Sequence, residues 1–237
     1  MSGTSYTALY SLQTKVLQLF STINSPFYLT GGTALGRFYL HHRYSADLDF
    51  FVNNHPDFKK EIEPFEYAIR SNFFLQKEGS LVTDDFVRYL IVDDNISLKI
   101  EFVNDVAYRY KNPISNSVYP IDNIRNILSN KLTCILGRDE PKDFFDILCI
   151  SLSFQFNWLE IFNEATEKAL INEIDLSQRI ADFPAKWLAN IDWLIQPPDI
   201  SQIKLFQEII SKDILLGSDN SLGLSGTRLD NSVINFR

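Results

Sequence analysis

The order of hydrophobic and polar residues predicts a mixture of helices and strands up to about residue 112. Apolar residues at intervals of three and four are typical of one face of a helix, and this spacing predicts helices over residues 5–22, 33–41 and 57–71. Short apolar runs predict strands at residues 27–30, 47–52, 73–77, 86–92 and 96–103. The last run alternates between apolar and polar side chains, so that strand is expected to have two distinct faces.

Beyond residue 113 the pattern is helical and contains almost no strand. An apolar stripe that starts at Ile121 ends at Gly137, and Pro141 opens the next helix, which is expected to reach residue 155. Further helices are expected at residues 157–170, 172–183 and 200–211. The tail from Gly217 is rich in Gly, Ser and Asn, so it is expected to be loosely held.

These elements predict an α+β protein made of two parts. Residues 1–112 are expected to form a small mixed-sheet core with flanking helices, and residues 113–237 an all-helical domain. The chain of 237 residues is long enough to bury a substantial core. Its net charge of −8 is shared unevenly, because the first part has 11 Lys+Arg against 13 Asp+Glu and the second has 11 against 17.

Composition limits the classes of partner. The acidic balance excludes a generic nucleic-acid coat, so RNA or a triphosphate would need a local cluster of cations, a metal ion or both. No apolar run approaches the roughly 20 residues that span a bilayer, and the N-terminus has no signal-peptide pattern, so no membrane partner is expected. Cys134 and Cys149 are expected to be small buried hydrophobic residues, which is typical of a cytoplasmic protein.

Candidate chemistry begins with two aspartates in an otherwise apolar strand. Asp47 and Asp49 are two residues apart, so they project from one face, while Leu48 and Phe50 project from the other. Neighbouring carboxylates repel one another and are costly to desolvate, and a bound cation removes both problems. Oxygen-only ligands suit Mg²⁺, which completes its shell with water and substrate phosphates. The alternative is a strand end whose aspartates point into water.

Two further features accompany these aspartates. Gly31, Gly32 and Thr33 follow a strand and open a helix, where backbone N–H groups and a hydroxyl can bind an anion. Glu101 lies on the polar face of a later strand, and it would face the same metal if that strand neighbours the one with the aspartates. The alternatives are an ordinary strand-to-helix turn and a solvated strand face.

The helical part contains a second group of charged residues. Lys131 lies on the border of the apolar stripe, where a lysine either extends its ammonium to water or meets a negative partner such as a triphosphate. Asp143 lies in the first turn after Pro141, where the helix dipole alone favours an acid. Asp146 lies one turn later, and the alternative to a functional role for it is a pairing with a nearby cation, Arg138 or Lys142.

Three basic residues lie between the predicted phosphate turn and the two aspartates. Arg43 and His42 lie just before Asp47, and Arg37 lies on the helix after the glycines. Each either contacts phosphate or is a surface charge.

The motifs together resemble a known family. Gly-Gly-Thr, a gap of 13 residues, Asp-Leu-Asp and a later carboxylate resemble the signature of the polymerase-β-like nucleotidyltransferases. The stretches LTGGTAL and HRYSADLDFF, followed by NKLTCILGRDEPKDFFDIL at residues 130–148, are similar to the AbiEii/AbiGii toxins of type IV toxin–antitoxin systems. The resemblance covers about residues 28–148.

This resemblance implies a fold and residue roles. It implies a nucleotidyltransferase core in the first part and a helical domain that contributes to the active-site cleft. The nucleotide phosphates would be held by Gly31, Gly32, Thr33, Arg43 and Lys131. Mg²⁺ would be bound by Asp47, Asp49 and Glu101, although family members often have Asp at the last position. Lys131 and Asp143 would form a downstream active-site pair.

The function predicted is Mg²⁺-dependent transfer of a nucleotide from an NTP to an acceptor hydroxyl. The acceptor implied by the resemblance is a tRNA 3′ end or a protein, and a cognate antitoxin is an implied partner. Three alternatives stay open: a non-catalytic module that binds nucleotide or antitoxin, a nucleotidyltransferase acting on a small molecule such as an antibiotic, and a structural protein.

Overall fold

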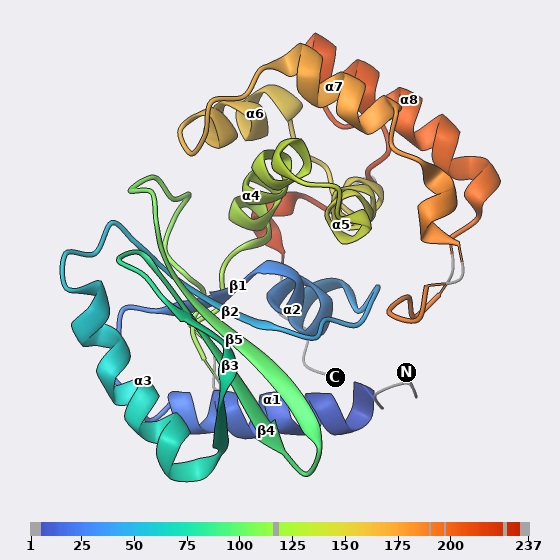
Figure 1. Cartoon of the computed structure of the whole chain (residues 1–237). Helices are drawn as coiled ribbons and strands as arrows, with labels where there is room; N and C mark the ends of the chain where they lie inside the picture. The colour runs from blue at the N-terminus through green and yellow to red at the C-terminus, as the bar shows by residue number, and fades with distance from the viewer. Residues whose placement is uncertain (1–5, 116–118, 190, 197, 225–226, 233–237) are drawn as a thin grey trace. The chain divides into compact units, whose positions relative to one another are not determined.

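The computed structural model describes residues 6–115, 119–189, 191–196, 198–224 and 227–232 (Figure 1). Contacts divide the chain into two compact units, and each is described by itself. The sheet unit falls within Met1–Ala34, Tyr44–Ala107 and Asn112–Asp122, and the helical unit within Leu35–Arg43, Tyr108–Lys111 and Asn123–Arg237. The units therefore interleave along the sequence instead of dividing near residue 113. That residues 1–112 and 113–237 are separate domains stays a prediction.

The sheet unit is built around a five-stranded sheet with the order β1-β2-β5-β4-β3. Its strands are β1 (Tyr28–Thr30), β2 (Leu48–Asn53), β3 (Phe74–Val82), β4 (Phe86–Asp93) and β5 (Ile96–Asp105). β2 and β5 run parallel, whereas the other neighbouring pairs are antiparallel. The parallel pair brings together two strands that lie far apart in the sequence.

Two helices, α1 (Tyr6–Phe20) and α3 (Phe58–Asn72), cover one face of this sheet (Figure 1). Phe20 of α1 and Phe65 of α3 both contact Phe102 of β5, with ring centroids 6.1 and 5.1 Å apart. The apolar positions that supply this face are fully buried: Leu48, Phe50, Leu98, Ile100 and Phe102. Because side chains alternate along a strand, the residues between them lie on the opposite face.

The chain leaves β1 through two short helical segments. α2 (Gly31–Leu35) continues into a π-helical turn, η1 (Gly36–Leu40), and the next residue, His41, has a left-handed backbone with φ of 52°. The helix expected over residues 33–41 is therefore two short pieces. Such π turns are uncommon and concentrate near functional sites.

The helical unit contains five longer helices among its described residues. They are α4 (Ile124–Gly137), α5 (Pro141–Ser153), α6 (Trp158–Thr166), α7 (Glu173–Ala181) and α8 (Ile200–Leu216), with 3₁₀ turns η2 (Ala185–Leu188) and η3 (Leu229–Asn231). α4 packs against α5, α6 and α7, and α7 packs against α8. Asn123, Asn157 and Asn172 precede α4, α6 and α7, and each side chain accepts a backbone N–H of the first turn.

The α+β fold class predicted from the sequence is confirmed, with a mixed sheet followed by helices. The expectation of a loose tail is wrong for the described residues after Gly217. The Asn220 amide donates to the carbonyls of Ser151 and Phe154, at 2.6 and 2.7 Å, and Leu229 is buried. These bonds satisfy carbonyls near the end of α5, which a composition argument does not reveal.

Two smaller expectations also have an outcome. Cys134 and Cys149 are free, but they are partly buried rather than fully buried. Across the described part of the chain, no helix combines the length and the apolar character needed to cross a membrane.

Candidate active site

A row of polar side chains crosses the sheet on the face opposite the aromatic core. Asp49 of β2 is the direct partner of Glu101 in the parallel β2–β5 pair. Thr30 of β1 is the partner of Asp49 on one side, and Arg88 of β4 is the partner of Glu101 on the other. Directly opposed residues share a face. The strand adjacency on which the role of Glu101 depends is therefore present.

Asp47 is connected to the turn that follows β1. The Thr33 hydroxyl donates a hydrogen bond to the backbone carbonyl of Asp47, and Thr33 is fully buried. The Gly-Gly-Thr and Asp-Leu-Asp segments are thus joined by a direct hydrogen bond, which holds the turn after β1 beside the start of β2. This hydroxyl is already engaged with the Asp47 carbonyl, and the contact of Thr33 with phosphate stays a prediction.

Gly31 gives the Asp49 carboxylate the space that it occupies. The glycine has φ of 68°, a left-handed conformation, and a Cβ at this position would lie 2.6 Å from Asp49 Oδ2. A side chain would therefore be strained by the backbone and would also collide with the carboxylate. Gly32, the next residue, is buried.

Replacing Gly31 by Ala is expected to lower the free energy of unfolding by about 1–3 kcal/mol, because the new methyl group overpacks the site. Gly137→Ala is a matched control, since nothing lies within 4 Å of its Cβ position. Urea denaturation followed by circular dichroism measures both. Equal stability of Gly31→Ala and the unsubstituted protein would contradict the packing argument.

The carboxylates of the sheet unit are paired with two cations. Lys99 Nζ lies 3.0 Å from Asp47 Oδ2 and 3.3 Å from Glu101 Oε1, and Arg88 Nε donates to Glu101 Oε1 at 2.7 Å. Burial alone would raise the pKa of Glu101, but Arg88 and Lys99 hold it below its ordinary value. Burial alone would lower the pKa of Lys99, but Asp47 and Glu101 raise it. Glu101 and Lys99 therefore both stay charged at neutral pH.

The donor set of this face fits Mg²⁺ through two carboxylates. Asp49 lies on β2 and Asp47 immediately precedes this strand, and two carboxylates completed by water and phosphate are a usual set of ligands for Mg²⁺. Within the described ranges, no group of three or more His, Cys, Asp or Glu side chains is suitable for a metal ion. The Glu101 carboxylate binds Arg88 and Lys99 instead, so its role as a third metal ligand stays a prediction.

The sequence points to Lys99 and Arg88 only weakly. Lys99 is marked by its position two residues before Glu101, on the same strand face. The pairing of Arg88 with Glu101 depends on the register of β4 against β5, and the signal for that register is the turn at Asp94 and Asn95, which pairs Asp93 with Ile96.

The helical unit contains a separate, buried charge cluster. Lys131 is 6% exposed, and its Nζ lies 2.7 Å from Asp143 Oδ1 and 2.8 Å from Asp146 Oδ2. Burial lowers the pKa of Lys131, but the two carboxylates outweigh that effect and raise it. The alternative of a lysine that extends to water is therefore wrong, because Lys131 has buried negative partners.

Arg43 and His42 belong to the same cluster. The Arg43 guanidinium donates to Asp146 through Nε at 2.6 Å and Nη2 at 2.8 Å, and Arg43 is 2% exposed. His42 Nε2 lies 2.8 Å from Asp146 Oδ1, while burial lowers its pKa. A buried carboxylate occupies this guanidinium, and the contact of Arg43 with phosphate stays a prediction.

The expected partner of Asp146 is also corrected. Arg138 binds Asp143 at 2.7 Å, and Asp146 binds Arg43, Lys131 and His42. The reason is that Asp146 lies fully inside the unit, whereas the Arg138 side chain is 55% exposed. That Lys131 and Asp143 form an active-site pair stays a prediction.

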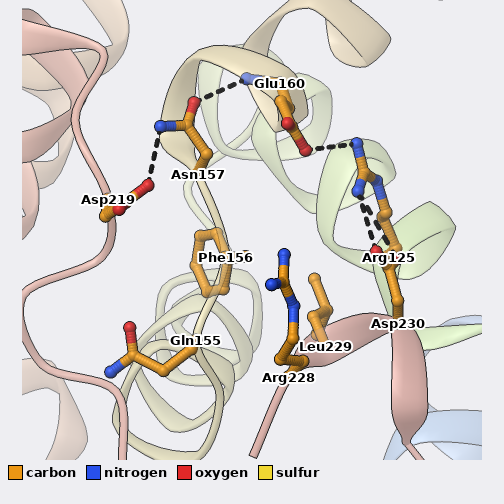
Figure 2. A pocket seen from close by; sticks show the side chains of 9 residues that line it. All are labelled: Arg125, Gln155, Phe156, Asn157, Glu160, Asp219, Arg228, Leu229 and Asp230. Atoms are coloured by element: carbon orange, nitrogen blue, oxygen red, sulfur yellow. Dashed lines mark hydrogen bonds and ion pairs between the residues drawn. The ribbon is translucent and has the colours of Figure 1, made fainter. Parts of the chain in front are cut away.

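A pocket of about 320 Å³ is also present in the helical unit (Figure 2). Arg125 lines it and binds Glu160 at 3.0 Å, while Asn157 donates to Asp219 at 2.9 Å. None of the predicted site residues lines this pocket. It therefore adds nothing to the candidate active site.

Comparison with solved structures shows the fold of the chain. JHP933 from Helicobacter pylori is 22% identical, with a TM-score of 0.59, and the match covers 90% of this chain and 92% of that one. MenT4, the nucleotidyltransferase toxin Rv2826c from Mycobacterium tuberculosis H37Rv, is 14% identical, with a TM-score of 0.58, and the match covers 89% of this chain and 84% of that one. At these identities the likeness concerns the fold alone.

The family of the chain comes from a family model rather than from a single related protein. A search of curated proteins finds no significant match. The family model described as "Nucleotidyl transferase AbiEii toxin, Type IV TA system" matches residues 16–214, which include both charged clusters. The chain therefore belongs to the AbiEii family of nucleotidyl transferase toxins of type IV toxin–antitoxin systems.

Proposed function

We propose that this protein transfers a nucleoside monophosphate from an NTP to an acceptor hydroxyl in a Mg²⁺-dependent reaction. The observation that carries the proposal is the polar row of the sheet unit. Asp49 lies opposite Glu101 across a parallel strand pair, Asp47 is bonded to the turn after β1, and Gly31 leaves space for the Asp49 carboxylate. A same-face pair of aspartates beside a glycine turn suits a metal-bound nucleotide.

The reaction is an in-line displacement at phosphorus. The acceptor oxygen forms a bond to the α-phosphorus of the NTP, and the bond from that phosphorus to the bridging oxygen of the β-phosphate breaks. Pyrophosphate leaves with the electron pair of that bond, and the hydroxyl proton passes to a base. When bound, Mg²⁺ supplies electrostatic stabilisation of the phosphate oxygens as charge develops on them.

The residues of the sheet unit have distinct roles in this proposal. Asp47 and Asp49 hold the metal, Thr33 fixes the backbone at Asp47, and the bare backbone of Gly31 leaves room for the Asp49 carboxylate. Glu101 orients Arg88 and Lys99. Because its pKa is lowered, Glu101 is a weak base. We therefore propose that water takes the proton from the hydroxyl that receives the nucleotide.

Membership of a toxin family supports a proposal for the acceptor and for a partner protein. We propose a macromolecular acceptor, either a tRNA 3′ end or a protein hydroxyl, and a cognate antitoxin that restrains the activity in the cytoplasm. The net charge of −8 favours a small contact area on RNA over a broad one. The predicted contribution of Lys131 and Asp143 to catalysis belongs to this proposal as well.

Incubation with each labelled NTP and total cell RNA and protein tests the proposal. We expect label in one macromolecular fraction, release of pyrophosphate, and loss of both signals when EDTA removes the metal, because Asp47 and Asp49 need a cation to bind triphosphate. Calorimetric NTP binding without pyrophosphate release would favour a non-catalytic module. Label only in a small molecule would favour an antibiotic-type enzyme, and no Mg²⁺-dependent NTP binding would contradict the proposal altogether.

A further inference from the structure

Lys99 places a positive charge within the carboxylates of the sheet unit. Its Nζ lies 3.0 Å from Asp47 Oδ2 and 3.3 Å from Glu101 Oε1. Lys99 and Glu101 are two residues apart on β5, so they share a face, and Asp47 immediately precedes β2, the parallel neighbour. The ammonium therefore bridges two strands at the carboxylates that the proposed function gives to a metal.

An ammonium and a divalent cation cannot both keep these positions. Mg²⁺ binds carboxylate oxygen at about 2.0–2.1 Å, so it would compete with the ammonium for the negative charge of the Asp47 carboxylate. Like charges a few ångströms apart also repel strongly when they are partly removed from water. Metal binding at Asp47 therefore requires Lys99 to withdraw.

The surroundings of Lys99 allow that movement. Its side chain is 33% exposed, so the flexible stem can carry the ammonium to water while the strand stays paired. Glu101 would keep Arg88, at 2.7 Å, after Lys99 has left. Asp47 would lose its ion pair with Lys99, and the metal would replace that cation.

We propose that Lys99 is an internal counter-ion that competes with the divalent metal for Asp47 and so sets the metal affinity of the site. The inference rests on the proposed function, because it takes Asp47 as a metal ligand. Without metal, Lys99 relieves the repulsion among Asp47, Asp49 and Glu101, which would otherwise destabilise this part of the β2–β5 pair. With metal bound, Lys99 is released from Asp47.

The test is Mn²⁺ binding to the full chain without nucleotide, measured from the electron paramagnetic resonance signal of free Mn²⁺. Lys99→Met removes the charge and retains an unbranched apolar stem. We expect the Kd for Mn²⁺ to fall about tenfold, the size of effect that one neighbouring charge commonly has on an ionic equilibrium. We also expect a lower thermal midpoint in EDTA and a larger rise on adding Mn²⁺ than the unsubstituted protein shows.

Lys15→Met is the matched control. Lys15 also belongs to the sheet unit and pairs with an aspartate, Asp93, at 2.8 Å, so the substitution makes the same change in charge. We expect the Kd of this variant to equal that of the unsubstituted protein. An equal fall in the Kd for Mn²⁺ in both variants would assign the effect to net charge and overturn the inference. An unchanged or higher Kd for Lys99→Met would overturn it as well.

Failure of the proposed function gives a different result. Asp47→Asn should weaken Mn²⁺ binding markedly if Asp47 is a metal ligand. Equal Mn²⁺ binding by Asp47→Asn and the unsubstituted protein would show that Asp47 is not a metal ligand. That result would overturn both proposals. Weakened binding by Asp47→Asn together with an unchanged Lys99→Met variant would overturn only the role of Lys99.

Discussion

Replacing Asp47 by Asn is expected to slow nucleotidyl transfer by at least about 1,000-fold, which corresponds to about 4 kcal/mol of transition-state stabilisation. The amide is nearly the same size as the carboxylate, but it has no charge with which to hold a divalent cation. The backbone carbonyl of Asp47, which accepts the Thr33 hydroxyl, is unchanged. The Asp47 side chain is 35% exposed, so the fold should persist. The measurement is label transfer from radioactive NTP, with circular dichroism to verify folding.

Asp93→Asn is the matched control for this experiment. Asp93 is also a partly exposed aspartate of the sheet unit, and it pairs with Lys15 at 2.8 Å as Asp47 pairs with Lys99 at 3.0 Å. It lies at the end of β4 and has no proposed role in catalysis. Full activity is expected for this variant. Full activity of Asp47→Asn would instead remove Asp47 from the active site.

The sheet side of the candidate site follows from the sequence to a large extent. Alternation in β5 is visible in the residues, and it places Glu101 on the polar face. The two-residue spacing of Asp47 and Asp49 predicts a common face in the same way, although β2 begins at Leu48 and contains Asp49 alone. What periodicity cannot provide is the register, and only the parallel pairing of β2 with β5 sets Asp49 opposite Glu101.

The remaining contacts depend on burial, which composition does not reveal. The sequence predicts that Arg43 is a surface charge or a phosphate ligand. In the structure it is 2% exposed and bound to Asp146, a residue 103 positions away. The end of the chain reads as a loose tail, yet Asn220 satisfies two carbonyls near the end of α5. Both cases arise because long-range hydrogen bonds compensate polar groups that local pattern assigns to the surface.

Replacing Asp146 by Asn is expected to lower the free energy of unfolding of the helical unit by about 3–5 kcal/mol. Asp146 is fully buried and neutralises Arg43, at 2.6 Å, and Lys131, at 2.8 Å. The amide cannot neutralise these cations, and they stay in a site with little access to water. Urea denaturation, with hydrogen exchange of α4 and α5 to report on this unit, measures the loss.

The loss of stability caused by Asp146→Asn is expected to depend on pH. Burial would raise the pKa of Asp146, but Arg43 and Lys131, with the hydrogen bond from His42, hold it well below its ordinary value of 3.8. A lowered pKa means that the carboxylate stabilises the folded state above pH 3.8, and that this contribution is lost as pH falls through the folded-state pKa. The stability difference between the two proteins should therefore be full at pH 7 and shrink below pH 3.8.

Asp139→Asn is the control, because Asp139 also pairs with an arginine of the helical unit, Arg179, but its side chain is 65% exposed. Exposed ion pairs contribute little to stability, so this variant should unfold like the unsubstituted protein at every pH. A loss of stability in Asp146→Asn that is no greater than in Asp139→Asn would show that the buried cluster does not stabilise the fold. A loss that stays constant down to pH 2 would show that the charge of Asp146 is not its source.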